Sequence, residues 1–209
     1  MFQKFLLISF HILMGLFATV ALCSCKEDSV TVYRVPKEAP KPLAEAKDST
    51  SGGGMTVLPG MAETAAQFET PEWVAPAGWQ PQPLGQIRKG SWRIEGISGQ
   101  AADVSVSVFP GDVGGILANV NRWREQIGLQ PVTEGNLETT QVSIGERSGQ
   151  LIVLEGPAPE EGQAYPQSIL GCLVSVEGST WIFKMMGDAP LIAEQGQVFD
   201  AFLQTVRFP

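Results

Sequence analysis

Two cysteines separated by one residue, Cys23 and Cys25, are the residues whose spacing points most directly to chemistry. They end an apolar run, Phe5–Leu22, that contains no lysine, arginine or acidic residue and that follows a single basic residue, Lys4. A short basic start, an apolar middle and a small-residue exit are the layout of a secretory signal. The cysteines could therefore close a transmembrane anchor, be ordinary thiols, or mark a processing site.

The residues at the end of the apolar run favour a processing site. Leu22-Cys23-Ser24-Cys25 resembles the lipobox of bacterial lipoproteins, with leucine three places before the modified cysteine and a small residue directly before it. The resemblance implies removal of residues 1–24, a diacylglycerol on the Cys25 thiol and a further acyl chain on its new amino group. Such chains hold a protein firmly, because two membrane signals already give stable anchoring. The alternatives are an uncleaved helix, since about 20 apolar residues span a bilayer, and a plain secreted protein.

The residue after the modified cysteine bears on location. Many lipoproteins that stay in the inner membrane of Gram-negative bacteria have aspartate there, whereas this chain has Lys26. By resemblance, lysine favours the outer membrane. We therefore expect a lipid-anchored protein of the cell envelope that faces the periplasm or the exterior.

The charge of the chain argues against nucleic acid as a partner. The formal net charge is −8, and removal of residues 1–24 makes it one unit more negative, because Lys4 is the only charged residue lost. Neutralisation of phosphates by lysine and arginine supplies most of the affinity for nucleic acids. We expect no nucleic-acid binding.

Histidine chemistry is missing from the processed chain. The only histidine, His11, lies inside the signal, which excludes serine or cysteine nucleophiles activated by histidine and histidine zinc sites. Carboxylates such as Asp103, Glu155 and Asp188 are plentiful, but nothing in the sequence pairs them. We therefore expect a noncatalytic protein without a cofactor or a metal site.

After processing, Cys172 is the one unmodified thiol, so no intramolecular disulfide can form. It alternates with Leu170 and Val174, which predicts an inert thiol on the apolar side of a strand. Met185 and Met186 are predicted to point to opposite faces of one strand, so both cannot bind one soft metal ion.

The chain divides into three segments: a signal peptide over 1–24, a lipidated flexible tether over 25–69, and a globular domain over 70–209. The tether is rich in proline, glycine, alanine and charge and lacks a sustained period, so it cannot bury enough apolar surface to order. Its "SVTVYRV" stretch alternates briefly and could instead dock to a partner as a strand.

In the globular domain, the first two strands are expected at Ser91–Ile97 and around Val104, Val106 and Val108, which alternate with serines. A helix between Asp112 and Gly128 follows, with Asp112 as candidate N-cap. Its expected buried face consists of Ile116, Val120, Trp123 and Ile127. Four more strands are expected in "TTQVSIG", "GQLIVLEG", "SILGCLVSVEG" and "TWIFKMMG", and a last helix in "APLIAEQGQVFDAFLQTVRF", which Gly196 weakens.

This order, β-β-α-β-β-β-β-α, predicts an α+β domain in which helices cover the apolar face of an antiparallel sheet. The end of the chain, "WIFKMMGDAPLIAEQGQVFDAFLQTVRF", resembles the closing strand, loop and final helix of PsbP-like domains. "PAGWQ" and "PGDVGGILANVNRWREQIGL" are similar to uncharacterised bacterial lipoproteins of that type. The resemblance covers residues 71–209 and implies an antiparallel sheet sandwiched by helices in an accessory or binding protein, without a catalytic motif.

Three places are candidates for ligand or partner binding. "PGDVGG", with Asp112, Gly114 and Gly115, is either a structural turn or an anion contact at a helix start, although the aspartate would repel an anion. Asn119 and Arg122 lie on a helix face apart from Trp123, which is either solvated or a recognition surface. The third place contains two tryptophans, Trp73 and Trp79, which either line a groove or fix the start of the domain to its core.

Two functions follow from these features. The leading hypothesis is a noncatalytic envelope lipoprotein, anchored through Cys25, whose domain binds a protein or another envelope component. The alternative is a lipid-anchored carrier of a small hydrophobic or anionic ligand, held between the sheet and the Asp112–Gly128 helix. The oligomeric state is left open.

Overall fold

The computed structural model describes residues 61–159 and 161–209, with side chains from Thr64 onward. The signal, Cys25 and the tether up to residue 60 lie outside the described residues. No helix in the described part is long and apolar enough to cross a membrane.

In chain order the elements are α2 (Met61–Ala66), β1 (Gln80–Pro81), β2 (Arg88–Glu95), β3 (Ala101–Pro110), α3 (Gly115–Gln126), the 3-10 turn η1 (Glu134–Asn136), β4 (Thr140–Ile144), β5 (Arg147–Glu155), β6 (Gln167–Val176), β7 (Ser179–Asp188) and α4 (Ala189–Thr205).

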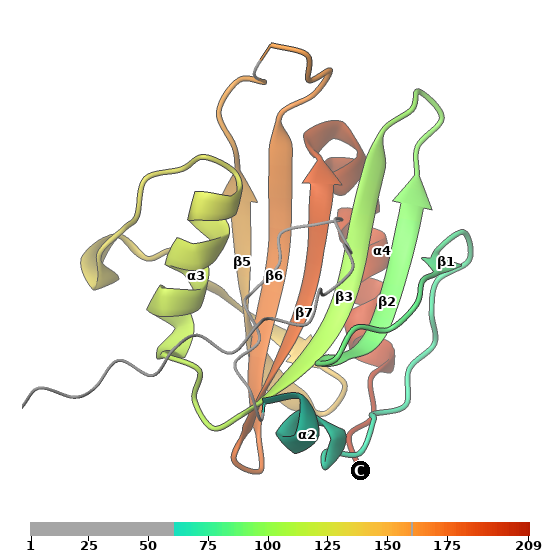
Figure 1. Cartoon of the computed structure of the whole chain (residues 1–209), viewed down its shortest axis with the longest axis vertical. Helices are drawn as coiled ribbons and strands as arrows, with labels where there is room; N and C mark the ends of the chain where they lie inside the picture. The colour runs from blue at the N-terminus through green and yellow to red at the C-terminus, as the bar shows by residue number, and fades with distance from the viewer. Residues whose placement is uncertain (1–60, 160) are drawn as a thin grey trace, which may run out of the picture. The chain divides into compact units, whose positions relative to one another are not determined.

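The strands form one seven-stranded sheet in the order β1-β2-β3-β7-β6-β5-β4, with antiparallel pairing throughout (Figure 1). Two meanders, β1 to β3 and β4 to β7, meet where β3 pairs with β7. The segment containing α3 carries the chain from β3 to the far edge at β4. The predicted α+β class and antiparallel sheet are confirmed.

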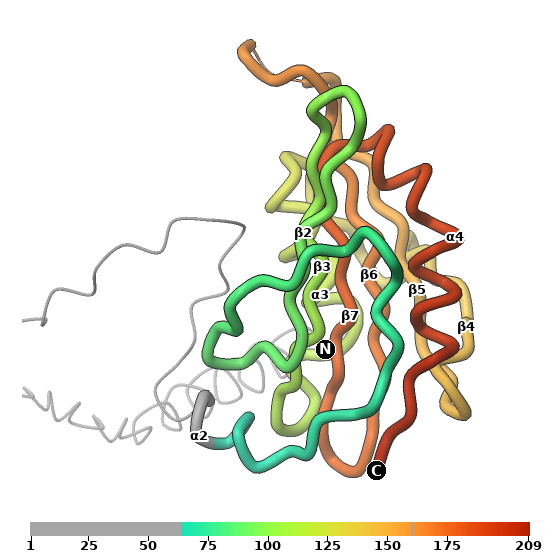
Figure 2. The backbone as a smooth tube through the Cα atoms, turned by 90° about the vertical axis from the view of Figure 1, so that its right-hand side faces the viewer, coloured from blue at the N-terminus to red at the C-terminus, as the bar shows by residue number. Residues whose placement is uncertain are grey.

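Helices α3 and α4 pack on opposite faces of this sheet. The core under α4 includes Val104, Cys172 and Phe183, whereas the core under α3 includes Ile169 and Leu173. Figure 2 shows α4 along one face of the sheet. The sequence predicted one apolar face, but β6 and β7 are apolar on both faces, which is typical of strands covered on both sides.

The valine face predicted for β3 is confirmed, because Val104, Val106 and Val108 are all fully buried, but the strand is not half-buried as expected, since Ser105 on the opposite face is buried too. The predicted helix is present as α3, and Trp123 on its expected face is 1% exposed. It stops before Gly128, whose φ of 75° lies in the left-handed region that glycine favours.

The start of α3 corrects one prediction. The N-cap is Gly114, with φ 84°, rather than Asp112. The Asp112 carboxylate instead accepts a hydrogen bond at 2.8 Å from the N–H of Gly115, the first residue of the helix. Two successive glycines in left-handed backbone add a turn between the aspartate and the helix, so Asp112 stabilises the helix start from outside it.

The packed domain includes residues that the sequence assigns to the tether. Helix α2 falls in the range assigned to the tether, and Ala65, at 1% exposed, belongs to the core. Phe68 packs against the same core, and its carbonyl accepts a hydrogen bond from Lys89 Nζ at 2.7 Å. A helix of only six residues shows no repeat from which periodicity could predict it.

Candidate functional site

The two predicted tryptophans lie in an aromatic cluster between the start of the domain and α4. Trp79 is 6% exposed, and its ring centroid is 5.1 Å from that of Phe202. Its Nε1 donates to Gln195 Oε1 on α4 at 3.2 Å. Trp73 is half-buried and packs edge to face on Trp92 at 5.9 Å. This packing fits the interpretation that both rings fix the chain to its core; partner binding by them stays a prediction.

The glycine-containing turn before α3 adjoins a hollow of about 440 Å³ beside β5 and β6. Asp112, Gly115 and Thr180 are among its lining residues, and the Thr180 hydroxyl donates to the Gly111 carbonyl at 2.7 Å. The amide at the helix start is already bonded to the Asp112 carboxylate. A negative group therefore occupies the position that an anion would take.

The polar face predicted on α3 points towards the sheet. Asn119 is fully buried, and its amide donates to the carbonyls of Gly115 at 2.8 Å and Val113 at 3.2 Å. Its Oδ1 accepts from Arg122 Nη1 at 2.9 Å, so Asn119 orients Arg122. One turn further, Gln126 Oε1 accepts from Lys184 Nζ on β7 at 3.0 Å. The face thus continues into side chains of the sheet, which sequence reasoning did not anticipate.

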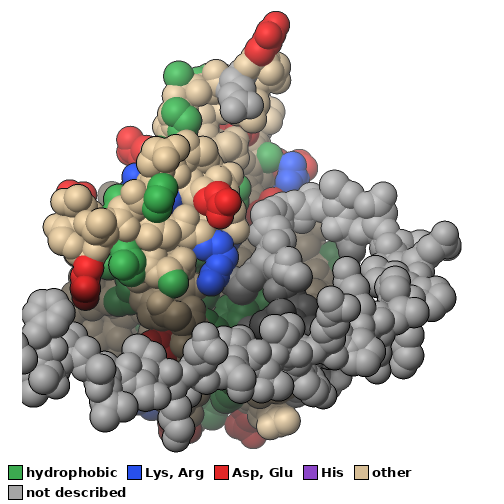
Figure 3. All heavy atoms as spheres, turned by 60° about the vertical axis from the view of Figure 1, so that its left-hand side comes forward, with side chains coloured by type: hydrophobic (Ala, Val, Ile, Leu, Met, Phe, Trp, Pro, Cys, Tyr) green, Lys and Arg blue, Asp and Glu red, His purple; other side chains and the backbone are tan. Residues whose placement is uncertain are grey.

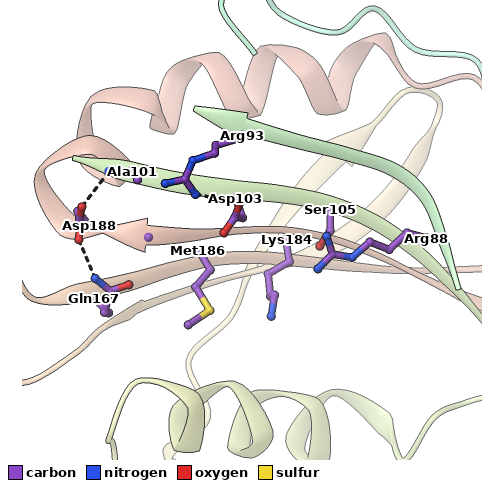
Figure 4. Close-up of a pocket in the computed structure, with 10 residues that line it drawn as sticks. Arg88, Arg93, Ala101, Asp103, Ser105, Gln167, Lys184, Met186 and Asp188 are labelled. Carbon is purple, nitrogen blue, oxygen red and sulfur yellow. Dashed lines mark hydrogen bonds and ion pairs between the residues drawn. The ribbon is translucent and has the colours of Figure 1, made fainter. Parts of the chain in front are cut away.

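On this side of the sheet lies a hollow of about 230 Å³, which we call the sheet pocket. Lys184 and Met186 point from β7 towards α3, and Arg88 reaches the region of Ser105 (Figure 4). Lys184 lies between Ser105 on β3 and Gly171 on β6 in the strand register. The pocket is lined by Arg88, Arg93, Ala101, Asp103, Ser105, Gln167, Lys184, Met186, Gly187 and Asp188.

A β-bulge places Arg88 in the sheet pocket. Gly90 pairs with Val106, whose side chain is in the core under α4, but Arg88 pairs with Ser107, on the opposite face, because the register shifts between Arg88 and Gly90. Without this shift, alternation would put Arg88 on the same face as Trp92. Bulges occur often where a side chain must be redirected at a functional site.

The carboxylates of the sheet pocket already have partners. Asp103 Oδ1 lies 3.6 Å from Arg93 Nη1, and Arg93 Nε lies 3.7 Å from Glu95. The Asp188 carboxylate accepts from the Ala101 N–H at 2.8 Å and from Gln167 Nε2 at 2.7 Å. These contacts hold the acidic groups at one end of the pocket, together with Arg93.

Arg88 and Lys184 have neutral partners instead. Arg88 Nη1 donates to Ser91 Oγ at 2.9 Å, and Lys184 donates to Gln126. Within residues 61–159 and 161–209, the ion pairs involve Arg93, and no carboxylate lies within ion-pair distance of Arg88 or Lys184. The pocket therefore holds two cations that none of these carboxylates neutralises directly.

The surroundings of Lys184 disfavour its charged form. Burial is the main reason that the pKa of Lys184 falls from 10.5 to about 8; the Arg88 and Arg122 guanidinium groups also lower it, and Asp103 acts in the opposite direction. Buried groups whose pKa is shifted beside specific charged neighbours occur often at functional sites. An anion beside Lys184 would favour its protonated form.

The predicted inert thiol lies on the other face. Cys172 is fully buried, and burial, followed by the Asp200 carboxylate, raises its pKa to about 12. Met185 lies in the core under α4 and Met186 packs in the core under α3, as predicted. The part of the chain that the structure describes contains no group of three histidine, cysteine or acidic side chains arranged to bind a metal ion.

Figure 3 shows acidic side chains and a few basic ones scattered over the described surface of this face. No protein-family model matches this chain, and no curated protein matches it. The chemistry of the site must be inferred from its own residues.

Proposed function

We propose that this chain is a noncatalytic, membrane-anchored lipoprotein of the bacterial cell envelope, and that its domain binds an envelope component through the sheet pocket. The observation that carries this proposal is the pair Arg88 and Lys184, gathered beside Arg122 in a chain with a formal charge of −8. Cations that gather at one place in a protein whose overall charge is negative attract an acidic partner to that place.

The contacts of the acidic groups support binding over catalysis. Asp103 is engaged with Arg93, and Asp188 is engaged with Gln167 and a backbone N–H. A general acid or base must reach a proton of the substrate. Carboxylates tied to neighbouring groups serve better to shape a pocket than to transfer protons.

The anchoring part of the proposal rests on the Leu22-Cys23-Ser24-Cys25 motif. Lipidated Cys25 attaches the chain to the outer membrane, and the segment that follows lets the domain reach its partner. We also propose a relationship to PsbP-like domains. It is supported by an antiparallel sheet with α3 and α4 on opposite faces and by a closing strand that leads directly into the last helix.

A lipid-anchored carrier of a small anionic ligand is the second candidate function. It is supported by the hydrogen bond between Lys184 and Gln126, because these residues lie on β7 and α3, the two elements between which a carrier of this kind would hold its ligand. A carrier releases its ligand without a lasting complex, whereas an adaptor stays attached to a partner in the envelope.

Replacement of the anchoring residue tests the proposed function. We expect Cys25→Ala to abolish processing and acylation, because the substitution removes the thiol that receives the lipid. Membrane fractionation combined with mass analysis of the N-terminal peptide measures both effects, with Cys172→Ala as the control that leaves them unchanged. An unmodified N-terminus in the native chain would contradict the lipoprotein assignment.

A further inference from the structure

The two cations of the sheet pocket define the kind of group that it takes. We propose that Arg88 and Lys184 together bind a phosphate monoester group of the partner or ligand. This inference rests on the proposed function, since it names the chemistry that the binding domain recognises. Phosphate fits because it accepts hydrogen bonds on several oxygens and carries close to two negative charges at neutral pH.

Charge matching separates phosphate from carboxylate. The acidic groups of the sheet pocket are bonded at its Arg93 and Gln167 end, whereas Arg88 and Lys184 donate to the neutral oxygens of Ser91 and Gln126. A phosphate dianion neutralises both cations, whereas a carboxylate neutralises one. Arg88 and Lys184 now donate to uncharged acceptors, so exchanging these acceptors for phosphate oxygens adds the Coulomb attraction of opposite charges in a partly buried site.

The positions of the two side chains suit a fixed site. Lys184 lies on β7, and Arg88 lies on β2, where the bulge turns its side chain to the same face. Strands of one sheet therefore hold both residues. Arg122 lies close enough to affect Lys184, and its bond to the buried Asn119 fixes its direction. A hollow of about 230 Å³ admits a phosphate group and a few attached atoms, with the remainder of the ligand outside.

Protonation of Lys184 couples this site to pH. The charged groups that act on Lys184 are Arg88 from β2, Arg122 from α3 and Asp103 from β3, and Arg93 lines the same pocket. Because the pKa of Lys184 is about 8 without ligand, its ammonium is lost as the pH rises through 8. Affinity for phosphate must therefore fall in that direction, while a phosphate monoester, with a second pKa of about 6, stays a dianion.

The test titrates the full-length chain in detergent with glycerol phosphate by calorimetry. We expect Lys184→Gln and Arg88→Gln each to weaken binding at about pH 7 by tenfold or more, because each removes a charge-assisted contact. Arg147→Gln removes the same charge from an exposed position on β5 and should change the affinity less than twofold. Native binding should weaken between about pH 7 and about pH 9.5, and this dependence should vanish in Lys184→Gln.

Glycerate is the matched carboxylate probe and should bind about tenfold more weakly than glycerol phosphate. Equal affinity for the two probes, or native affinity in both pocket variants, would overturn the proposal. Thermal unfolding of each variant shows whether it is folded. Absence of phosphate binding in a chain that is still acylated on Cys25 would overturn this inference alone, whereas loss of acylation would overturn the proposed function.

Two sources of the phosphate group are distinguished by competition. Mixed micelles with phosphatidic acid, compared with phosphatidylcholine micelles, should displace glycerol phosphate if a lipid headgroup is the natural source. Retained binding of glycerol phosphate in both micelles assigns the site to a phosphate outside the lipid layer. Either result supports the phosphate assignment.

Discussion

Replacing Phe202 by alanine is expected to lower the free energy of unfolding of the domain by about 3–5 kcal/mol. Phe202 is 1% exposed and lies at the centre of the aromatic cluster. Its ring contacts the rings of Trp73, Trp79, Trp92, Phe183 and Phe199 at centroid separations of 5.1–6.4 Å. The substitution therefore opens a cavity and removes several ring pairs at once, which connect α4, the sheet and the start of the domain.

Chemical denaturation at neutral pH measures this loss, and Phe208→Ala provides a matched control. Phe208 is partly exposed and has one aromatic neighbour, Trp181, at 5.7 Å, so its replacement should lower the free energy of unfolding by only about 1 kcal/mol. Equal losses in the two variants would show that the cluster around Phe202 does not hold the domain together.

The second large effect is expected for Gly171→Ala, which should destabilise the domain by about 3 kcal/mol or more. A Cβ atom on Gly171 would lie within 3.0 Å of three ring atoms of Trp123. Trp123 is almost fully buried and fixes α3 on the sheet, so the ring cannot move aside without separating the helix from β6. The melting temperature of the full chain is the first readout.

Replacing Gly196 by alanine should instead stabilise the domain. Gly196 lies inside α4. A Cβ atom added there would lie 3.9 Å from Leu170 Cδ1, which is an ordinary van der Waals distance. Alanine favours a helix over glycine by about 0.5–1 kcal/mol, so Gly196→Ala should raise the melting temperature. A stabilised Gly171→Ala variant, or a destabilised Gly196→Ala variant, would contradict the packing described for α3 and α4.

Features that depend on local periodicity could be predicted from the sequence. The alternation of Val104, Val106 and Val108 predicts a strand, and the spacing from Val120 to Trp123 predicts the buried face of α3. The hairpin connections predict neighbouring strands. Each of these signals lies within about ten residues and needs no knowledge of distant parts of the chain.

Features that depend on distant contacts could not be predicted. Strand alternation places Arg88 on the wrong face, because the bulge before Gly90 is visible only in the pairing with β3. Nothing in the sequence links Gly171 to Trp123, although they fit together across the sheet and α3. Lys184 could have been found from the sequence, because it is the single lysine in the apolar strand "TWIFKMMG". A charge placed in an apolar strand is costly unless it has a partner, so such a lysine indicates a candidate site.

Binding by the predicted site residues stays a prediction, and the structure shows only where they lie. The α3 polar face reaches the sheet pocket through the hydrogen bond of Gln126 with Lys184, and Arg122, which donates to Asn119, lowers the pKa of Lys184. Asp112 and Gly115 lie at the start of α3 and line a different hollow. The tryptophans belong to the core under α4, on the opposite face from the pocket. The sequence places these residues on elements, but only the sheet register decides which of them meet.

We propose the sheet pocket as the surface that binds an envelope component. Photo-crosslinking in the intact envelope tests it, with the crosslinking residue in place of Glu95, whose side chain is 62% exposed beside Arg93. Glu194, exposed on α4 over the other face, is the control position. We expect an adduct from position 95 that is lost in Lys184→Gln, and none from position 194. An adduct from position 194 alone, or one from position 95 that Lys184→Gln leaves unchanged, would contradict it.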